Sequence, residues 1–300
     1  MTINLITAKA IRNLRGFVTL SLLTLSSLFI PSLLALSGII KISLPKVLKP
    51  FFIQRIEPLE KAFYRMNHMI IKLCIPTAIE NKNPSIKLDN TKKYALICNH
   101  KSWLDIIILQ TLLIDTLPPL RFFLKDSLKW IPMIGPACWA LDFLFIKRYS
   151  KSEIKKDPRK KHANQLMIAK NCKTLLKRNC TLVNFVEGTR FHASKQHATS
   201  QYQQLLPPKG AGLSLLLRSM QPQIEHIIDA TLLYGCKSPS LWTFCCGDIP
   251  SITLSLDKLE VQASMLGDFY KDPQFKQSFS TWLQGLWLKK DQQLIDFYQP

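Results

Sequence analysis

A histidine and an aspartate, His100 and Asp105, are the residues of this sequence best suited to proton transfer. On one continuous helix they would point apart, because side chains that meet on a helix are three or four residues apart. They can meet if His100 lies in a loop and Asp105 lies in the first turn of the helix that follows. The carboxylate would then hold the proton of one imidazole nitrogen and leave the other free as a base for an attacking hydroxyl. The alternative is a structural histidine whose ring is satisfied by a nearby acid.

A second set of residues that could do chemistry is Glu187-Gly188-Thr189-Arg190, which follows the apolar run 181–186. Glycine permits a tight turn or a close approach to a ligand. Threonine adds a hydroxyl donor, and the planar guanidinium of arginine suits a phosphate. The same four residues could also form a surface turn with a local ion pair, so the tetrapeptide alone leaves both interpretations open.

Both groups are predicted to follow strands. The apolar run 94–98 comes after a polar, turn-prone stretch and predicts a buried strand, and the dense apolar segment 103–114 predicts a core-packed helix. This alternation predicts an α/β fold with a mixed, mostly parallel sheet flanked by helices. Ligand sites of such folds lie where strands end. Further strands are expected near residues 121, 143, 181 and 228, with helical segments that include 162–177.

The basic composition indicates an anionic partner. The chain has 40 Lys and Arg against 20 Asp and Glu, which gives a formal net charge of +20. Such an excess favours phospholipid head groups, nucleic acid, or phosphorylated or acidic substrates. Residues 150–165 are expected to form a basic loop, and this loop has no aromatic side chain on which bases could stack. No nucleic-acid partner is therefore expected.

The length and the cysteines set further bounds. Three hundred residues with 47% hydrophobic content supply a core for one large domain or two modest ones. The eight cysteines are scattered without a CxxC pair. This spacing predicts neither a zinc site nor a disulfide framework, so a reducing environment and no metal are expected.

The N-terminal region predicts a membrane anchor. Residues 16–40 contain no charge, and as a helix they would be about 37 Å long, against roughly 30 Å for the hydrocarbon core of a bilayer. Basic residues on both sides and Pro31 leave a spanning, re-entrant or monotopic anchor open. A cleaved signal peptide is the less favoured alternative, because the apolar region is too long. Residues 51–75 predict an amphipathic helix that lies along the membrane or packs on the domain.

Three sets of residues occur in order along the chain: Asn99-His100 with Asp105; Lys125, Pro132, Gly135 and Phe145-Ile146-x-Arg148; and Phe185-Val186-Glu187-Gly188-Thr189-Arg190. Together they resemble the motifs of the glycerophospholipid acyltransferase family, whose best-known members are the 1-acylglycerol-3-phosphate acyltransferases. The resemblance covers residues 92–234, and three ordered motifs are more specific than any one. Residues 205–210 and 228–234 look like later motif regions of the membrane-anchored subgroup.

Two departures from the family pattern concern prolines. Many relatives have Pro where this chain has Val186, and the later Val-Pro-type motif has no proline counterpart in residues 230–233. The second departure weakens any assignment of the acyl-chain pocket. The C-terminal part carries no motif, although the spacing of Phe279, Trp282, Leu286 and Trp287 suggests an amphipathic helix.

The resemblance implies a reaction and a role for each residue. His100, oriented by Asp105, would deprotonate the free hydroxyl of a lysophospholipid, which would attack the thioester of acyl-CoA or of an acyl carrier protein. The acceptor implied first is 1-acylglycerol-3-phosphate, which would give phosphatidic acid. No cofactor other than the acyl donor is expected. The residues implied in substrate binding are Asn99, Lys125, Arg148, Glu187, Gly188, Thr189 and Arg190, with the two arginines on the acceptor phosphate.

The division of the chain follows from this assignment. Residues 1–80 are predicted to form the anchor and the amphipathic helix, and residues 81–300 the acyltransferase domain, facing the cytoplasm. Membrane phospholipid and lysophospholipid are the expected partners. The alternatives are an acyltransferase with lysophosphatidylglycerol or lysophosphatidylinositol as acceptor, and a membrane-tethered basic binding protein without catalysis. Cys98, in an apolar strand, is expected to be a buried structural thiol rather than a nucleophile.

Overall fold

The computed structural model describes residues 2–45, 47–83, 86–147, 149, 151–157, 159–176, 178–196 and 200–299. Short 3-10 helices cover Asp126–Trp130, Ala193–Lys195 and Ala263–Met265. The longer elements, in chain order, are α1 (Thr2–Ser43), α2 (Lys49–Cys74), β1 (Ala78–Asn81), β2 (Lys93–Cys98), α3 (Leu104–Leu113), β3 (Leu120–Lys125), α4 (Ile134–Ala140), β4 (Leu144–Ile146), α5 (Lys151–Lys156), α6 (Arg159–Leu175), β5 (Thr181–Asn184), α7 (Gly210–Met220), β6 (Ile224–Tyr234), α8 (Leu241–Cys245), β7 (Ser251–Glu260) and α9 (Pro273–Tyr298).

The described strands form one sheet in the order β1-β7-β6-β2-β5-β3-β4. Neighbouring strands are parallel except β6 and β7, which are antiparallel. The predicted α/β class with a mixed, mostly parallel sheet is therefore confirmed. The sequence analysis missed β1 and β7. The alternation in β7 is visible in hindsight, because Ile252, Leu254 and Leu256 are buried on one face of the strand.

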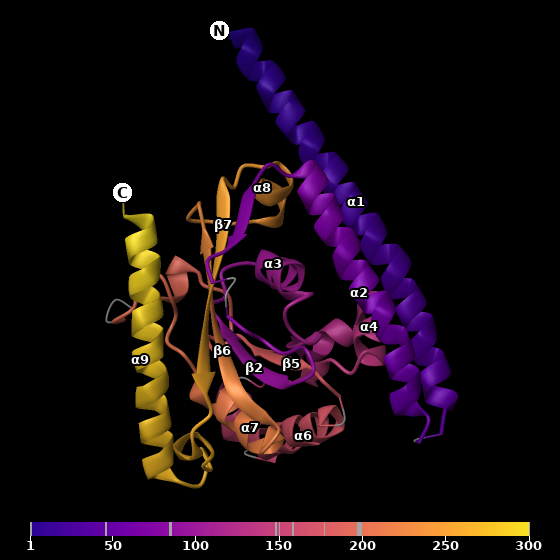
Figure 1. Cartoon of the computed structure of the whole chain (residues 1–300). Coiled ribbons are helices and arrows are strands. Elements are labelled where there is room, and N and C mark those ends of the chain that lie inside the picture. The colour runs from indigo at the N-terminus through magenta and orange to yellow at the C-terminus, as the bar shows by residue number, and fades with distance from the viewer. Residues whose placement is uncertain are drawn as a thin grey trace.

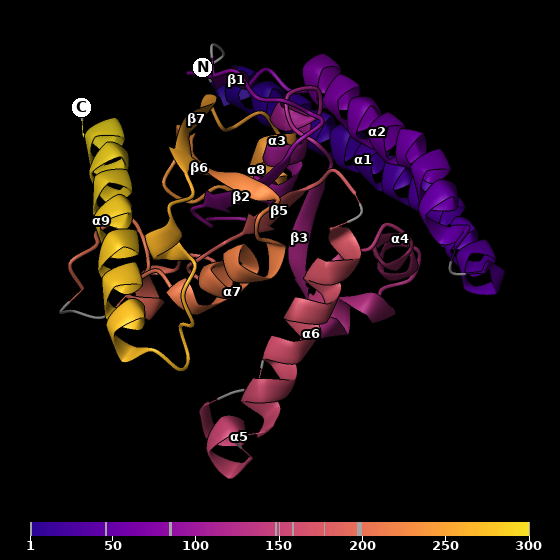
Figure 2. The same ribbon diagram turned by 60° about the horizontal axis from the view of Figure 1, so that its bottom comes forward.

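Helices cover both faces of the sheet, which explains the unbroken apolar run of β2. Side chains alternate along a strand, so Tyr94, Leu96 and Cys98 face one layer and Ala95 and Ile97 face the other. The first layer contains α3, α4 and the α1–α2 hairpin, and the second contains α6, α7 and α9. Figures 1 and 2 show α9 on the side of the sheet opposite the α1–α2 hairpin.

The α1–α2 hairpin packs against the rest of the protein. In Figure 1, the two helices lie side by side along one flank of the molecule. On α2, Ile56 and Ile71 are buried in the same core as α3. Glu60 forms a buried bidentate ion pair with Arg121 of β3, with distances of 2.6 and 2.9 Å. Packing on the domain, one of the two predicted alternatives for this helix, is therefore what the structure shows. The division of the chain at residues 80 and 81 stays a prediction.

Two other predicted segments can be compared with the structure. Residues 150–165 were expected as a loop, but α5 and the start of α6 occupy most of this stretch. The expectation was wrong because Lys, Arg, Gln and Glu are good helix formers even where nothing apolar anchors them. The predicted C-terminal amphipathic helix is α9, on which Phe279 and Trp287 are buried.

Candidate active site

His100 and Asp105 meet at the junction between β2 and α3. His100 lies in the loop after the strand, and Asp105 lies in the first turn of the helix. The imidazole Nδ1 is 2.7 Å from Asp105 Oδ2. The His100 side chain keeps 16% of its exposure, whereas the Asp105 side chain is fully buried. The Nδ1 edge of the ring is thus held by a buried carboxylate, and part of the ring stays accessible to solvent.

The partners of Asp105 determine which nitrogen of His100 carries the proton. Oδ2 also accepts the backbone N–H groups of Lys101 (2.8 Å) and Ser102 (2.9 Å). Oδ1 accepts the hydroxyl of Tyr234 at 2.6 Å. The two backbone N–H groups can only donate, so Oδ2 acts as an acceptor. Nδ1 therefore donates to Asp105, and Nε2, which bonds no side chain or backbone group of the described residues, is the acceptor, which is the arrangement a general base requires.

The imidazole is also held flat against an aromatic ring. The rings of His100 and Phe185 are stacked with centroids 4.0 Å apart and an interplanar angle of 15°. Phe185 directly follows β5, the strand next to β2. Together with the bond to Asp105, this stacking fixes both the position and the plane of the ring.

Glu187 lies beneath this arrangement rather than in the open cleft. It is buried, with Oε1 accepting the backbone N–H of His100 (2.8 Å) and Oε2 accepting that of Leu206 (3.0 Å). Burial raises the pKa of Glu187 to about 7. Both carboxylate oxygens are occupied by main-chain donors. The side chain therefore holds the backbone at His100, and the sequence analysis had instead assigned it to substrate binding.

Asn99, another of the residues assigned to substrate binding from the sequence, is fully buried. Its amide donates to the carbonyl of Leu232 (2.9 Å) and accepts the N–H of the same residue (2.8 Å). This double hydrogen bond joins the end of β2 to β6. Asn99 therefore supports the loop of His100 from below.

Four of the five remaining predicted residues line a cleft of about 640 Å³ into which His100 opens. Gly188, Thr189 and Arg190 line it from the loop after β5, and Lys125 lines it from the end of β3. Gly188 has a φ of +72°, a conformation that side chains with a Cβ rarely adopt. Arg148 lies outside the described residues.

The parallel sheet explains why these distant segments converge. β2, β3 and β5 run in the same direction, so their carboxyl ends share one edge of the sheet. His100 follows β2, Lys125 ends β3, and the turn containing Arg190 follows β5. The crevice at the carboxyl edge is where open α/β sheets bind ligands.

Cys98, which ends β2 beside the loop of His100, is not a competing nucleophile. Cys98 is fully buried, and burial raises the pKa of its thiol well above the ordinary value. A thiol that does not ionise is a poor nucleophile. Within the part of the chain that the structure describes, no group of three His, Cys, Asp or Glu side chains is arranged to hold a metal ion.

Comparison with known proteins relates this chain to acyltransferases. The family model described as Acyltransferase matches residues 78–224, from β1 to the start of β6. The 1-acyl-sn-glycerol-3-phosphate acyltransferase epsilon of Mus musculus is 26% identical over 232 residues, covering 70% of this chain and 59% of the mouse protein. The 1-acyl-sn-glycerol-3-phosphate acyltransferase 3 of Arabidopsis thaliana is 24% identical over 222 residues, covering 69% and 54%.

A solved structure has a similar fold. The crystal structure of the 1-acyl-sn-glycerophosphate acyltransferase from Thermotoga maritima matches with a TM-score of 0.51, covering 92% of this chain and 97% of that one at 13% identity. The family model and the two relatives together support a 1-acylglycerol-3-phosphate acyltransferase-like family for this chain. The chain spans little more than half the length of the mouse and Arabidopsis relatives that it matches.

Sequence reasoning missed three side chains that complete the site. The hydroxyl of Tyr234 donates to Asp105. The guanidinium of Arg190 lies over the ring of Trp103, with its Cζ 5.0 Å from the ring centroid. Lys209 packs closely against Gly188: a Cβ added to this glycine would lie 3.1 Å from the Nζ of Lys209. A weak signal existed for Tyr234, because a tyrosine that ends a long apolar strand needs a partner for its hydroxyl.

Proposed function

We propose that this chain transfers a fatty acyl group from acyl-CoA or an acyl carrier protein to the free hydroxyl of a lysophospholipid. The acceptor we propose is 1-acylglycerol-3-phosphate, with phosphatidic acid as the product. The observation that carries the proposal is the free Nε2 of His100, fixed by Asp105, at the wall of a cleft that also presents Arg190 and Lys125. The mouse and Arabidopsis relatives are named as 1-acyl-sn-glycerol-3-phosphate acyltransferases, which supports the choice of acceptor.

In the proposed reaction, His100 Nε2 removes the proton of the acceptor hydroxyl while that oxygen attacks the thioester carbonyl carbon. The tetrahedral adduct collapses with cleavage of the C–S bond. The proton on Nε2 then goes to the departing sulfur, which leaves as the free thiol. Asp105 accepts the Nδ1–H throughout and stabilises the imidazolium that forms between the two transfers.

The acceptor phosphate is proposed to bind the cations of the cleft. Arg190 is half-buried and fixed over Trp103, so its planar donors are already oriented for a phosphate. Lys125 and Lys209 add point charges from two other segments of the lining. A charged acceptor held in this way would present its glycerol hydroxyl to His100.

An apolar cavity beside the cleft is proposed to hold an acyl chain. It has a volume of about 280 Å³ and shares Trp103, Ile106 and Phe122 with the cleft of His100. Its far wall is formed by α1 and α2, where the polar group of Glu60 and Tyr64 lies. An extended hydrocarbon reaching from the cleft would therefore lie between the sheet and the α1–α2 hairpin.

We infer that α1 attaches the protein to a membrane surface. Among the described residues, α1 supplies the one helix that is long and apolar enough to cross a bilayer. However, Arg15 near its start donates to the carbonyl of Cys246, and Lys41 at its end pairs with Asp142. The two contacts lie about 39 Å apart along the helix, which exceeds the roughly 30 Å thickness of the hydrocarbon core of a bilayer. This attachment favours a helix lying along the membrane, with the catalytic domain on the cytoplasmic side.

Acyl transfer by the purified full chain tests the proposal. Labelled acyl-CoA or acyl carrier protein would be supplied with lysophosphatidic acid, lysophosphatidylglycerol or lysophosphatidylinositol. The Arg190→Gln variant is expected to raise the KM for lysophosphatidic acid about tenfold or more, because it removes a charge-assisted contact to phosphate. Arg55→Gln, an exposed arginine on α2, is the matched control. An unchanged KM in R190Q would contradict this placement of the phosphate, and preference for another head group would reassign the acceptor.

A further inference from the structure

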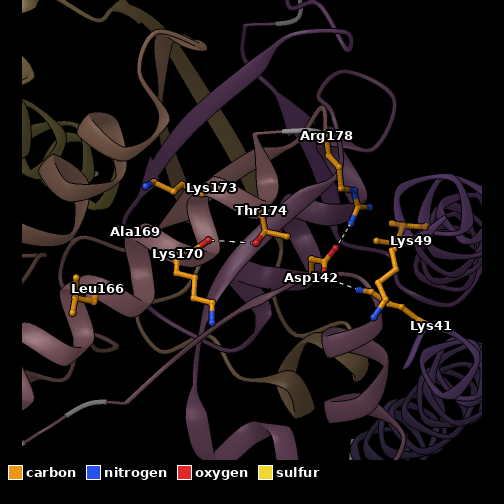
Figure 3. Close-up of a pocket in the computed structure, with 10 residues that line it drawn as sticks. Lys41, Lys49, Asp142, Leu166, Ala169, Lys170, Lys173, Thr174 and Arg178 are labelled. Carbon is orange, nitrogen blue, oxygen red and sulfur yellow. Dashed lines mark hydrogen bonds and ion pairs between the residues drawn. The ribbon is translucent and has the colours of Figure 1, made fainter. Parts of the chain in front are cut away.

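A second cleft, of about 900 Å³, lies where the α1–α2 turn approaches α6 (Figure 3). It shares no lining residue with the cleft of His100. α6 separates the two, because Ile168 lines the first cleft and Ala169 lines the second. The lining of the second cleft consists of Lys41, Lys49, Ile53, Asp142, Leu166, Ala169, Lys170, Lys173, Thr174 and Arg178.

The charges of this cleft are unbalanced. Its lining holds five cationic side chains and one carboxylate, that of Asp142. Asp142 is shared between Lys41 (2.6 Å) and Arg178 (2.9 Å), as Figure 3 shows. Arg178 also pairs with Glu57 outside the cleft. Lys41 and Arg178 are therefore neutralised by acids of the protein, and three lysines are left.

Those three lysines, Lys49, Lys170 and Lys173, form no ion pair with any described carboxylate. Lys170 and Lys173 lie on α6, and Lys49 lies across the cleft on α2, as Figure 3 shows. An anion bound in the cleft would balance positive charge that no acid of the cleft neutralises. The cleft thus has the charge and the room for a phosphate group.

An exposed apolar surface adjoins the cleft. The α1–α2 turn exposes Ile39 (63%), Ile42 (64%), Val47 (77%) and Phe51 (66%) to solvent. Lys41 and Lys49, which bracket this turn in the chain, both line the cleft, so the exposed apolar side chains belong to the same turn as two of its cations. Clustered exposed side chains of this size mark a surface that contacts another apolar phase. A soluble phosphate would use the lysines alone, whereas a phospholipid would use both surfaces.

We propose that this cleft binds the head group of an anionic membrane phospholipid, at a site separate from the acceptor cleft. The phosphate lies among Lys49, Lys170 and Lys173, and the acyl chains lie along the exposed side chains of the α1–α2 turn. The bound lipid fixes how α6, and hence the wall of the neighbouring cleft, is oriented on the membrane. This inference does not depend on the acyl-transfer proposal.

The test measures binding of the full chain to two kinds of vesicle, phosphatidylcholine alone and phosphatidylcholine mixed with phosphatidylglycerol. The ratio of the two affinities isolates the head-group contribution from the apolar anchor. The variant K49Q/K170Q/K173Q is expected to lower this ratio about a hundredfold, because each lysine near an anionic surface contributes several-fold. Transfer to detergent-dispersed acceptor should be unchanged, since none of the three lysines lines the cleft of His100.

The matched control is K271Q/K276Q/K289Q, which removes three exposed lysines from α9 and the segment before it. The control should keep most of the affinity ratio, and an equal loss in both variants would show that only net charge matters and overturn the proposal. Glycerol 3-phosphate should not displace the wild type from mixed vesicles any better than sulfate at the same ionic strength. Displacement by glycerol 3-phosphate would mean that the cleft recognises a soluble phosphate, which also overturns it.

Discussion

The chemistry at residue scale depends on how completely Asp105 is surrounded by donors. Its two oxygens accept from His100, Lys101, Ser102 and Tyr234, and its side chain is fully buried. A buried carboxylate without donors would take up a proton instead of holding the imidazole. The N–H groups at the start of α3 and the tyrosine hydroxyl are therefore as necessary to the proposed base as Asp105 itself.

Replacing Tyr234 with Phe tests this dependence. The change removes one hydrogen bond to an ionised group, which is worth about 1.5–3 kcal/mol, and leaves the ring in place. We expect kcat for acyl transfer to fall about tenfold, with the KM for the acceptor unchanged. Tyr94→Phe is the matched control, because Tyr94 is also buried and its hydroxyl bonds only the backbone N–H of Asp89 among the described residues. Equal kcat values for Y94F and Y234F would contradict the role of Tyr234.

The residues of the site were predictable to different degrees. The pairing of His100 with Asp105 follows from helix spacing and from a loop after an apolar strand, and the structure shows it. The positions of Glu187 and Asn99 beneath the cleft did not follow, because a sequence shows that a polar residue ends a strand but not which way it points. The contact between Tyr234 and Asp105 joins segments 129 residues apart and needs the strand order to be known.

At the scale of elements, Glu187 connects three segments. It follows β5 and accepts main-chain N–H groups from the loop after β2 and from the segment that leads to α7. The carbonyl of His100 in turn accepts the N–H of Phe191 at 2.7 Å. Both the N–H and the C=O of His100 are therefore bonded to the segment that carries Arg190. These bonds fix the distance and orientation between the proposed base and the proposed phosphate ligand.

The raised pKa of Glu187 predicts a pH effect on stability. Burial raises this pKa from 4.5 to about 7, so the folded protein takes up the proton at a higher pH than the unfolded chain does. The stability that protonation contributes is therefore complete below about pH 4.5 and is lost as the pH rises to about 7. We expect the free energy of unfolding of the wild type, relative to Glu187→Gln, to fall by about 3 kcal/mol over that range.

Denaturant unfolding of both proteins at several pH values measures this difference. Other titrating groups cancel, because the two proteins differ at one position. A difference that stays constant, or that grows as the pH rises, would show that the two N–H bonds to Glu187 outweigh its burial.

At the scale of the whole molecule, the α1–α2 hairpin packs against the domain on one side and exposes an apolar surface on the other. One side of α1 packs on α2, α4 and α8, and buried residues such as Leu34 belong to the main core. The other side exposes Leu25 (61%), Phe29 (68%) and Leu36 (58%). This two-sided use favours a helix that lies in the membrane surface with the domain attached.

Making that exposed side polar tests the attachment. The variant L25Q/F29Q/L36Q removes three large apolar side chains, each worth about 1.5–3 kcal/mol when buried in an apolar phase, and leaves the packed side intact. We expect the fraction of protein that sediments with membranes to fall several-fold, with the thermal unfolding temperature little changed. Leu288→Gln, an exposed leucine on α9, is the control and should sediment as the wild type does.

The fold class was readable because alternating apolar strands and helices leave few other architectures. Five of the strands of the sheet were located from their apolar runs. The strand order and the direction of β7 could not be derived, because they depend on pairings between segments far apart in the chain. The helical state of residues 151–156 was missed for a different reason: its signal is intrinsic propensity, which hydrophobic periodicity does not record.

The measurement that tests the central claim most directly is acyl transfer by the full chain with and without the proposed base. The wild type is expected to convert lysophosphatidic acid and labelled acyl-CoA or acyl carrier protein to phosphatidic acid. His100→Ala should lower this rate at least about a hundredfold and leave the fold intact by circular dichroism. A wild type that is silent on every lysophospholipid with both donors, or an H100A variant with full activity, would contradict the account.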